Sequence, residues 1–134
     1  MGGINSSVDF SVADFTNFDE LAMVIMPGGL SWETVNYPQI ADFIKTVRAV
    51  EIPVAAICGA TYFLCKHGFL NEIRHTGDAL SLFQSVKEYT GENFYISAQV
   101  VYDNEFITAN ETAAVEFAYQ IFKILNIDSD EEIE

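Results

Sequence analysis

The chain has 134 residues, half of them hydrophobic, and its 20 acidic side chains far outnumber its 6 lysines and arginines. This length and apolar content predict one folded domain with its own core rather than a disordered chain. The net charge of −14 disfavours binding to nucleic acid or to anionic membranes, both of which attract Lys and Arg. No apolar run approaches the roughly 20 residues that span a bilayer, and residues 1–6 lack the basic start and apolar core of a secretion signal.

The first half of the chain contains two apolar runs that predict strands. Residues 21–26 form a continuous apolar run that stops at Pro27, a pattern typical of a parallel strand buried on both faces. Residues 52–58 form the second run. Between them, residues 38–50 show a helical period of apolar side chains, and the segment begins with proline, which is favoured in the first turn of a helix.

The middle of the chain predicts a helix and then less regular structure. Residues 59–67 predict a helix that Gly68 closes from a C-cap position. We expect a short strand around Ile73. Residues 78–88 are ambiguous in their periodicity, and we assign them to a helix.

The last third predicts a hairpin and a terminal helix. Residues 100–108 predict two short strands around an Asp-Asn turn. Residues 112–125 predict a final helix with one apolar face. Because strands and helices alternate, we expect an α/β fold with a parallel sheet. The domain would span residues 1–127, with residues 128–134 as a solvated acidic tail.

Cys58 stands between a predicted strand and a predicted helix. A cysteine at this point lies on a sharp turn, and the free N–H groups of the helix lower the pKa of its thiol. The same arrangement carries the nucleophile of α/β hydrolases. The alternative is a buried and inert cysteine at the end of a strand. Cys65 is predicted to lie in the core. Two cysteines spaced in this way indicate reduced thiols of a cytoplasmic protein rather than a disulfide framework.

Further motifs surround Cys58 in a definite order along the chain. They are Met26-Pro27-Gly28-Gly29, Ala55-Ala56-Ile57-Cys58-Gly59-Ala60, Gly68-Phe69-Leu70, His75-Thr76-Gly77 and Ile107-Thr108-Ala109-Asn110-Glu111-Thr112-Ala113. Together they resemble the ThiJ/PfpI family of the class I glutamine-amidotransferase-like superfamily, from about Val8 to Leu125. The resemblance implies a three-layer flavodoxin-like sandwich with a mostly parallel sheet, usually dimeric, and it implies no cofactor.

The resemblance also assigns roles to individual residues. Cys58 matches the elbow cysteine of the family, and the backbone N–H groups of Gly29 and Gly59 match the oxyanion pocket, where two amides stabilise charge on a carbonyl oxygen. His75 is the candidate base, with Thr76 as the competitor for the same aligned position. The alternative for His75 is a local hydrogen bond at the end of a strand. We expect no metal site, because the two histidines and two cysteines show no ligand spacing.

The chain departs from the family pattern in three ways. Relatives usually begin with a strand, a helix and a strand before the region that matches Val8, and that helix supplies a glutamate to the cysteine. The resemblance therefore implies an N-terminally truncated member with uncovered apolar surface. Gly59 stands where many protease-like members carry His. Neither His67 nor His75 is followed by Glu two residues on, as the late histidine of glutamine amidotransferases is.

The leading functional hypothesis is a cysteine-dependent hydrolase or amidase, resembling intracellular proteases or amidotransferase-like proteins. It would act as a homodimer on an unidentified small-molecule or peptide substrate. Two alternatives stay open: a redox-responsive stress protein in which Cys58 is oxidised to sulfinic acid, and a catalytically silent interaction domain. Fold alone does not choose among the three. Glu111 and Glu116 are interpreted as surface or cap residues.

Overall fold

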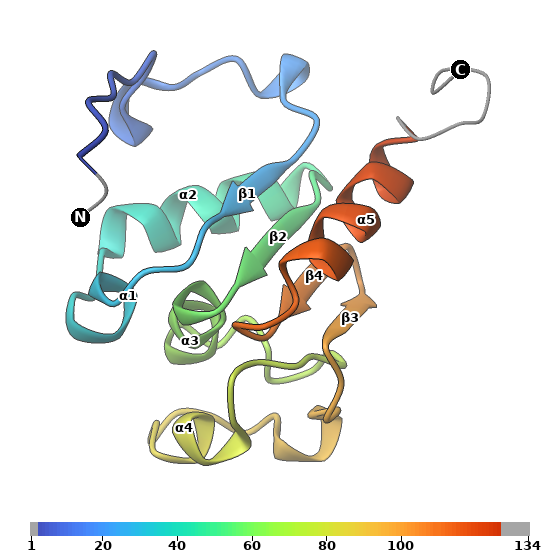
Figure 1. Ribbon diagram of the computed structural model, residues 1–134. Coiled ribbons are helices and arrows are strands. Elements are labelled where there is room, and N and C mark those ends of the chain that lie inside the picture. The colour runs from blue at the N-terminus through green and yellow to red at the C-terminus, as the bar shows by residue number, and fades with distance from the viewer. Residues whose placement is uncertain (1–2, 127–134) are drawn as a thin grey trace.

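The computed structural model describes residues 3–126, which build a mixed α/β fold on a four-stranded sheet (Figure 1). Strands β1 (Val24–Met26), β2 (Val54–Ile57) and β4 (Phe106–Ala109) lie next to one another in parallel. Strand β3 (Val100–Asp103) pairs antiparallel with β4 and forms the other edge. The predicted α/β fold with a mostly parallel sheet is therefore confirmed.

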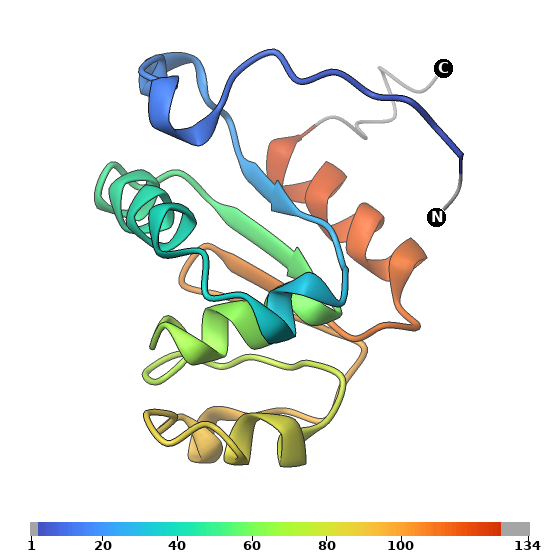
Figure 2. The same cartoon turned by 90° about the vertical axis from the view of Figure 1, so that its left-hand side faces the viewer.

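Helices lie on both faces of this sheet and complete the three layers. Figure 2 shows α2 and α3 on one side of the strands and α5 on the other. Short helical segments connect these layers. The α-helices are α1 (Ser31–Thr34), α2 (Pro38–Ala49), α3 (Gly59–Lys66), α4 (Leu80–Gln84) and α5 (Ala114–Leu125), and single 3-10 turns occupy Val12–Asp14, Phe18–Glu20 and Glu92–Phe94.

Alternate side chains of β2 separate the core into two parts. Val54 and Ala56 are fully buried in the cluster that includes α2 and α3. Ala55 points the other way, into the cluster with Phe117 and Ile121 of α5. Both faces of β2 are thus covered, as the apolar run 52–58 predicts.

Several boundaries follow from the local residue types. Helix α2 begins with Pro38 at its first turn, as expected. Helix α3 ends just before His67, and Gly68 follows with a φ of +82°, a left-handed conformation that glycine adopts without strain. Asn104 and Glu105 both have positive φ between β3 and β4, which is the conformation of a tight two-residue hairpin turn.

Three sequence-based predictions need correction. No strand forms around Ile73; instead, His75 makes an isolated bridge to Tyr95. The helix expected over residues 78–88 is limited to Leu80–Gln84. The run 21–26 is not buried on both faces, because β1 pairs only with β2 and the side chain of Ile25 is 51% exposed.

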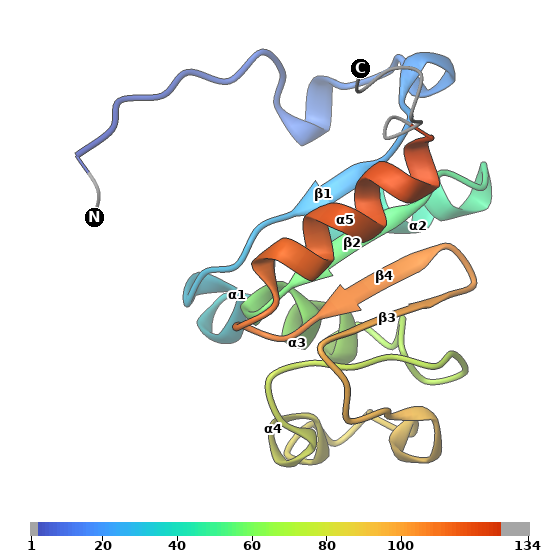
Figure 3. The ribbon, with the colours of Figure 1, turned by 45° about the vertical axis from the view of Figure 1, so that its right-hand side comes forward.

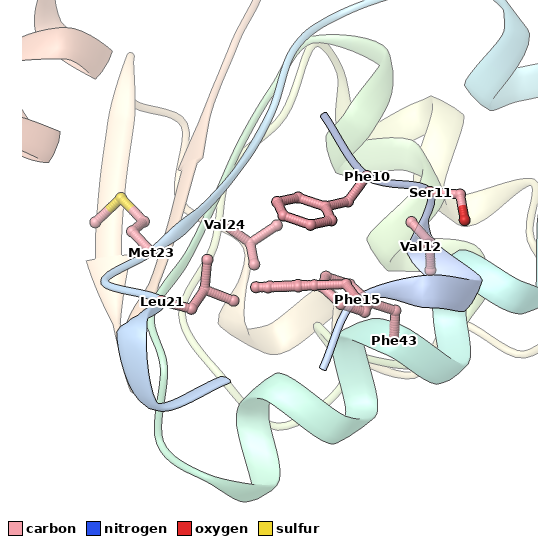
Figure 4. A pocket seen from close by; sticks show the side chains of 8 residues that line it. All are labelled: Phe10, Ser11, Val12, Phe15, Leu21, Met23, Val24 and Phe43. Atoms are coloured by element: carbon pink, nitrogen blue, oxygen red, sulfur yellow. The ribbon is translucent and has the colours of Figure 1, made fainter. Parts of the chain in front are cut away.

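The N-terminal part of the chain packs beside β1 through aromatic side chains. Phe15 stacks on Phe18, with ring centroids 5.3 Å apart, and both contact Phe43 of α2. Phe15 and Phe43 border an open apolar hollow of about 260 Å³ next to Leu21 and Val24 (Figure 4). Within residues 3–126, no helix combines the length and apolar character needed to cross a membrane. The acidic tail predicted at residues 128–134 lies outside the described part.

Candidate active site

Cys58 lies at the junction of β2 and α3 in a strained backbone conformation. Its φ and ψ are 59° and −127°, a region that a residue with a side chain rarely adopts. Its N–H donates to the carbonyl of Ala109 at 3.0 Å, and its own carbonyl accepts from the N–H and the hydroxyl of Thr61 at 3.0 and 2.7 Å. The end of β4 and the first turn of α3 therefore hold the predicted sharp turn in place.

The glycine loop after β1 packs directly against this turn. The Cα of Gly59 approaches the carbonyl oxygen of Gly29 so closely that a side chain at residue 59 would overlap it. A Cβ atom on Gly28 would lie 2.9 Å from the Cβ of Cys58. Trp32 fixes the same loop by donating from Nε1 to the carbonyl of Pro27 at 2.8 Å. The two glycines matched to the oxyanion pocket are thus neighbours in space.

Two carboxylates, from Asp78 and Glu111, face the thiol of Cys58. The sulfur and one oxygen from each carboxylate all lie within 4.8 Å of one another. The Oδ1 of Asp78 accepts from the backbone N–H of Glu111 at 2.7 Å. This hydrogen bond ties the loop before α4 to the loop after β4, so the cluster has a fixed frame.

Sequence reasoning missed both carboxylates. Glu111 was interpreted as a surface or cap residue, and Asp78 fell in an ambiguous segment. The sequence does contain one signal for Glu111: like Cys58, it follows directly after an apolar run that predicts a strand. Ile57 and Ala109 lie side by side in the parallel register, so both loops leave the same edge of the sheet.

The electrostatics of Cys58 differ from the sequence-based prediction. Burial raises the pKa of its thiol above the ordinary value, and the negative charges of Asp78 and Glu111 raise it further. The backbone N–H of Gly59 lowers the pKa, as expected at a helix N-terminus, but its effect is smaller than that of burial. The resting side chain is therefore a thiol rather than a thiolate.

Cys65 lies in the core, as predicted. It is fully buried among apolar side chains, and burial raises the pKa of its thiol to about 12. Its sulfur lies 3.9 Å from the carbonyl oxygen of Phe83. Cys58, by contrast, is partly accessible.

His75 is fully buried, and both of its ring nitrogens have partners. Nδ1 lies 2.7 Å from the carbonyl of Ile73 and must carry the proton, because a carbonyl only accepts. Nε2 therefore accepts from the hydroxyl of Tyr89 at 2.7 Å. Burial lowers the pKa of His75. This is the local hydrogen bonding given as the alternative in the sequence analysis.

Thr76, the competitor of His75, is also engaged elsewhere. Its N–H donates to the hydroxyl of Thr108 at 2.9 Å, and its own hydroxyl donates to the carbonyl of Ala98 at 2.9 Å. Among residues 3–126, no hydrogen bond joins Cys58 to His75 or Thr76. A catalytic role for His75 stays a prediction, and the carboxylates of Asp78 and Glu111 are the acidic groups beside the thiol.

The Cys58, Asp78 and Glu111 cluster is also the one described group whose atoms lie close enough to share a metal ion. Accessible carboxylates are common on protein surfaces without a bound ion. A cysteine binds a metal as the thiolate, whereas Cys58 is a protonated thiol here. Next to the cluster, a polar hollow of about 270 Å³ is lined by Asp78, Tyr95, Ser97 and Asn110 among others. It offers hydroxyl and amide groups beside the nucleophile.

Comparison with known proteins identifies the family of this chain. Residues 1–124 fit the family model described as the DJ-1/PfpI family. The chain belongs to the DJ-1/PfpI family. This result confirms the ThiJ/PfpI resemblance drawn from the motifs around Cys58.

Curated relatives and solved structures of this family cover nearly the whole chain. The chain is 38% identical over 135 residues to the "Uncharacterized protease YdeA" of Bacillus subtilis, with all of this chain and 66% of that protein aligned. It is 33% identical to the "Uncharacterized protease YoaZ" of the same organism, over 95% of this chain and 60% of that protein. A ThiJ/PfpI family protein from Bacillus anthracis superposes with a TM-score of 0.84 at 32% identity, covering 94% of this chain and 59% of that one. The chain thus spans about three fifths to two thirds of the length of these relatives.

Proposed function

We propose that this chain carries the nucleophile and the oxyanion amides of a cysteine hydrolase that cleaves peptide or other amide bonds. The observation that carries the proposal is the backbone of Cys58, whose φ of 59° presents the sulfur at the start of α3 against the glycine loop. Two curated relatives that bear the name protease support the same class of reaction. A homodimer in the cytoplasm is part of this proposal.

The chemistry starts from the protonated thiol. The sulfur of Cys58 attacks the substrate carbonyl carbon while its proton passes to the carboxylate of Asp78, which has an oxygen within 4.8 Å of the sulfur. The N–H groups of Gly29 and Gly59 stabilise the oxygen that becomes negative. As the C–N bond breaks, the leaving amine takes the proton from Asp78. Water then hydrolyses the thioester and restores the thiol.

In this scheme Asp78 accepts the proton because its carboxylate lies beside the thiol and is held in a fixed position. The hydrogen bond from the N–H of Glu111 holds the carboxylate of Asp78 in place at 2.7 Å. His75 contributes by keeping residues 73–77 in a fixed conformation through its bonds to Ile73 and Tyr89. The polar hollow beside Asp78 favours small polar substrates or the main chain of a peptide.

The redox alternative has less support from the site. Oxidation of a cysteine to sulfenic and then sulfinic acid starts from the thiolate. Because burial and two carboxylates raise the pKa of Cys58, little thiolate is present near neutral pH. Intact-mass measurement after peroxide treatment tests this alternative, and fast oxidation confined to Cys58 would favour it over hydrolysis.

Hydrolysis is tested with a mixed library of fluorogenic peptides and amino-acid amides. We expect release of the reporter by the wild-type chain, no release by Cys58→Ala, and retained release by the matched control Cys65→Ala. Mass spectrometry of the quenched reaction should show an acyl group on Cys58. Release that is equal in wild type and Cys58→Ala, or no release and no acylation with any substrate, would contradict the proposal.

A further inference from the structure

Glu111 carries a carboxylate that the proposed hydrolysis does not use. One of its oxygens, one oxygen of Asp78 and the sulfur of Cys58 lie within 4.8 Å of one another. Asp78 takes the proton in the proposed reaction. Among residues 3–126, the side chain of Glu111 forms no hydrogen bond or ion pair of its own, and the residue is exposed. Its carboxylate is therefore available to a substrate that reaches the sulfur.

The site around the sulfur is negatively charged. The charged side chains that act on the Cys58 thiol are those of Asp78 and Glu111, and both are negative. The lysines and arginines of the described residues pair with acidic side chains elsewhere, line a separate hollow or lie in the last turn of α5. They are Lys45, Arg48, Arg74, Lys66, Lys87 and Lys123. The site therefore attracts a positively charged group and repels a negatively charged one.

An α-ammonium group fits the spacing between Cys58 and Glu111. In an aminoacyl group, standard bond lengths place the amino nitrogen about 2.5 Å from the carbonyl carbon. A nucleophile attacks that carbon from about 3–3.5 Å, and an ammonium nitrogen binds a carboxylate oxygen at about 2.8 Å. These three lengths close readily across a gap of at most 4.8 Å between sulfur and oxygen. The ammonium of a lysine side chain lies four carbons farther out and would have to fold back to reach the same oxygen.

The polar hollow beside Asp78 places the other half of the substrate. Figure 3 shows that β2 and β4 point to the same end of the sheet, where the loops with Cys58 and Glu111 begin. Asp78 lines the hollow of about 270 Å³ together with Ser97 and Asn110, whereas Glu111 is not part of its lining. Since Asp78 returns its proton to the leaving amine, the leaving chain lies on the side of the hollow. Glu111 is then the carboxylate for the acyl half, which carries the amino terminus.

We propose that Glu111 binds the free α-ammonium group of the substrate, so that the enzyme removes the first residue of a peptide or acts on amino-acid amides. The cleavage rests on the proposed function, whereas recognition of the ammonium group can be measured without turnover. Binding also activates the nucleophile. The ammonium group offsets the negative charges that raise the pKa of Cys58, so the thiol loses its proton more readily once the substrate is bound. A substrate with a blocked amino terminus gains neither effect.

Turnover of matched substrates gives the first test, at pH 7, where an α-amino group is mostly protonated. Leucine 4-methylcoumarinyl amide should be cleaved with a kcat/KM at least about tenfold above that of its Nα-acetyl form. Glu111→Gln should remove this preference and leave cleavage of the acetylated form unchanged, because the backbone N–H that holds Asp78 is kept. Glu88→Gln, an exposed residue in a separate hollow, is the matched control. Equal kcat/KM values for the two substrates in the wild-type chain overturn this inference but not the hydrolase.

Alkylation of Cys58 tests the recognition step without turnover. In 2-bromoethylammonium the reacting carbon and the nitrogen are separated as in an aminoacyl group, whereas iodoacetamide is neutral and iodoacetate is negative. Each rate at Cys58, measured by peptide mapping, is divided by the rate of the same reagent with 2-mercaptoethanol.

The relative rate should be highest for the cation, at least about fivefold above iodoacetamide, and lowest for iodoacetate. Glu111→Gln should lower the preference for the cation, and Glu88→Gln should keep it. Equal relative rates of the three reagents in the wild-type chain overturn the inference. A preference for the cation that depends on Glu111, without turnover of any substrate, contradicts the hydrolase and supports recognition of the ammonium group.

Discussion

A carboxylate oxygen of Asp78 lies within 4.8 Å of the Cys58 sulfur, and the negative charge of Asp78 adds to the effect of burial in raising the pKa of the thiol. The two residues lie twenty positions apart in the sequence and on separate loops. Burial and this nearby charge make the resting cysteine a weak nucleophile, with a proton acceptor beside it. The reactivity of Cys58 is therefore coupled to the charge of residue 78, and this coupling can be measured.

Substitution of Asp78 by Asn should activate the thiol toward a simple alkylating reagent. Removing the negative charge lowers the pKa of Cys58, so the alkylation rate with iodoacetamide at pH 7.5 should rise about three- to tenfold. Amide hydrolysis should fall in the same variant, because the proton acceptor is lost. Asp42→Asn, an exposed residue of α2, is the matched control. An unchanged alkylation rate in Asp78→Asn would remove Asp78 from the site.

The two cysteines should differ strongly in labelling of the folded chain. Limited iodoacetamide should modify Cys58 first, because Cys65 is fully buried and has a thiol pKa of about 12. Peptide mapping by mass spectrometry locates the label. In urea both residues should react, which shows that the fold protects Cys65. Preferential labelling of Cys65 in the folded chain would contradict the assignment of the elbow.

The two glycines at the proposed oxyanion pocket should respond differently to an added methyl group. Gly59→Ala should destabilise the chain by about 1–3 kcal/mol and suppress labelling of Cys58, because its Cβ overlaps the carbonyl oxygen of Gly29. Gly29→Ala should be tolerated, since its Cβ meets only Trp32 at 3.8 Å. Urea unfolding measures the free energy of unfolding of both variants. Equal losses of stability would show that the close approach of the two loops is not specific.

Stability should fall as the pH drops below about 6.5, and His75 should contribute to this loss. Burial lowers the pKa of His75 in the folded chain, so the unfolded chain binds the proton more readily. The stability that His75 contributes is complete above its pKa in the unfolded chain, and it decreases as the pH falls toward its lower pKa in the folded chain. Urea unfolding from pH 5 to pH 8 measures the slope, which should be reduced in His75→Asn and kept in His67→Asn.

The same His75→Asn variant also tests the catalytic role predicted from the sequence. If His75 were the base for Cys58, its replacement by Asn would lower the alkylation rate and shift the pH profile of that rate upward. We expect an unchanged profile per folded molecule, because both ring nitrogens are engaged with Ile73 and Tyr89. A shifted profile in a folded variant would assign the proton transfer to His75 instead of Asp78.

Features that depend on neighbouring residues could be predicted from the sequence. Pro38 marks the start of α2, and Gly68 marks the end of α3, because the fixed φ of proline and the freedom of glycine act locally. The turn at Cys58 belongs to the same class, since it follows from a strand that meets a helix. These local signals were enough for the fold class and for the position of the elbow.

Features that depend on which loops meet could not be predicted. Glu111 reaches Cys58 because β2 and β4 are adjacent in the sheet, and Asp78 is joined to Glu111 by a hydrogen bond, so no single segment encodes the cluster. The direction of the Cys58 pKa shift could not be predicted either, because it depends first on the burial of the thiol and then on these two carboxylates. The exposure of Ile25 depends on β1 lying at an edge, which apolar periodicity alone does not reveal.

The left-handed backbone at Cys58 also bears on how this position can change over generations. Any residue with a side chain pays about 1–2 kcal/mol of strain in this conformation, whereas glycine adopts it freely. Selection for thermal stability alone would therefore favour glycine at residue 58. With cysteine at residue 58, the chain keeps this strain and presents a sulfur atom at the start of α3.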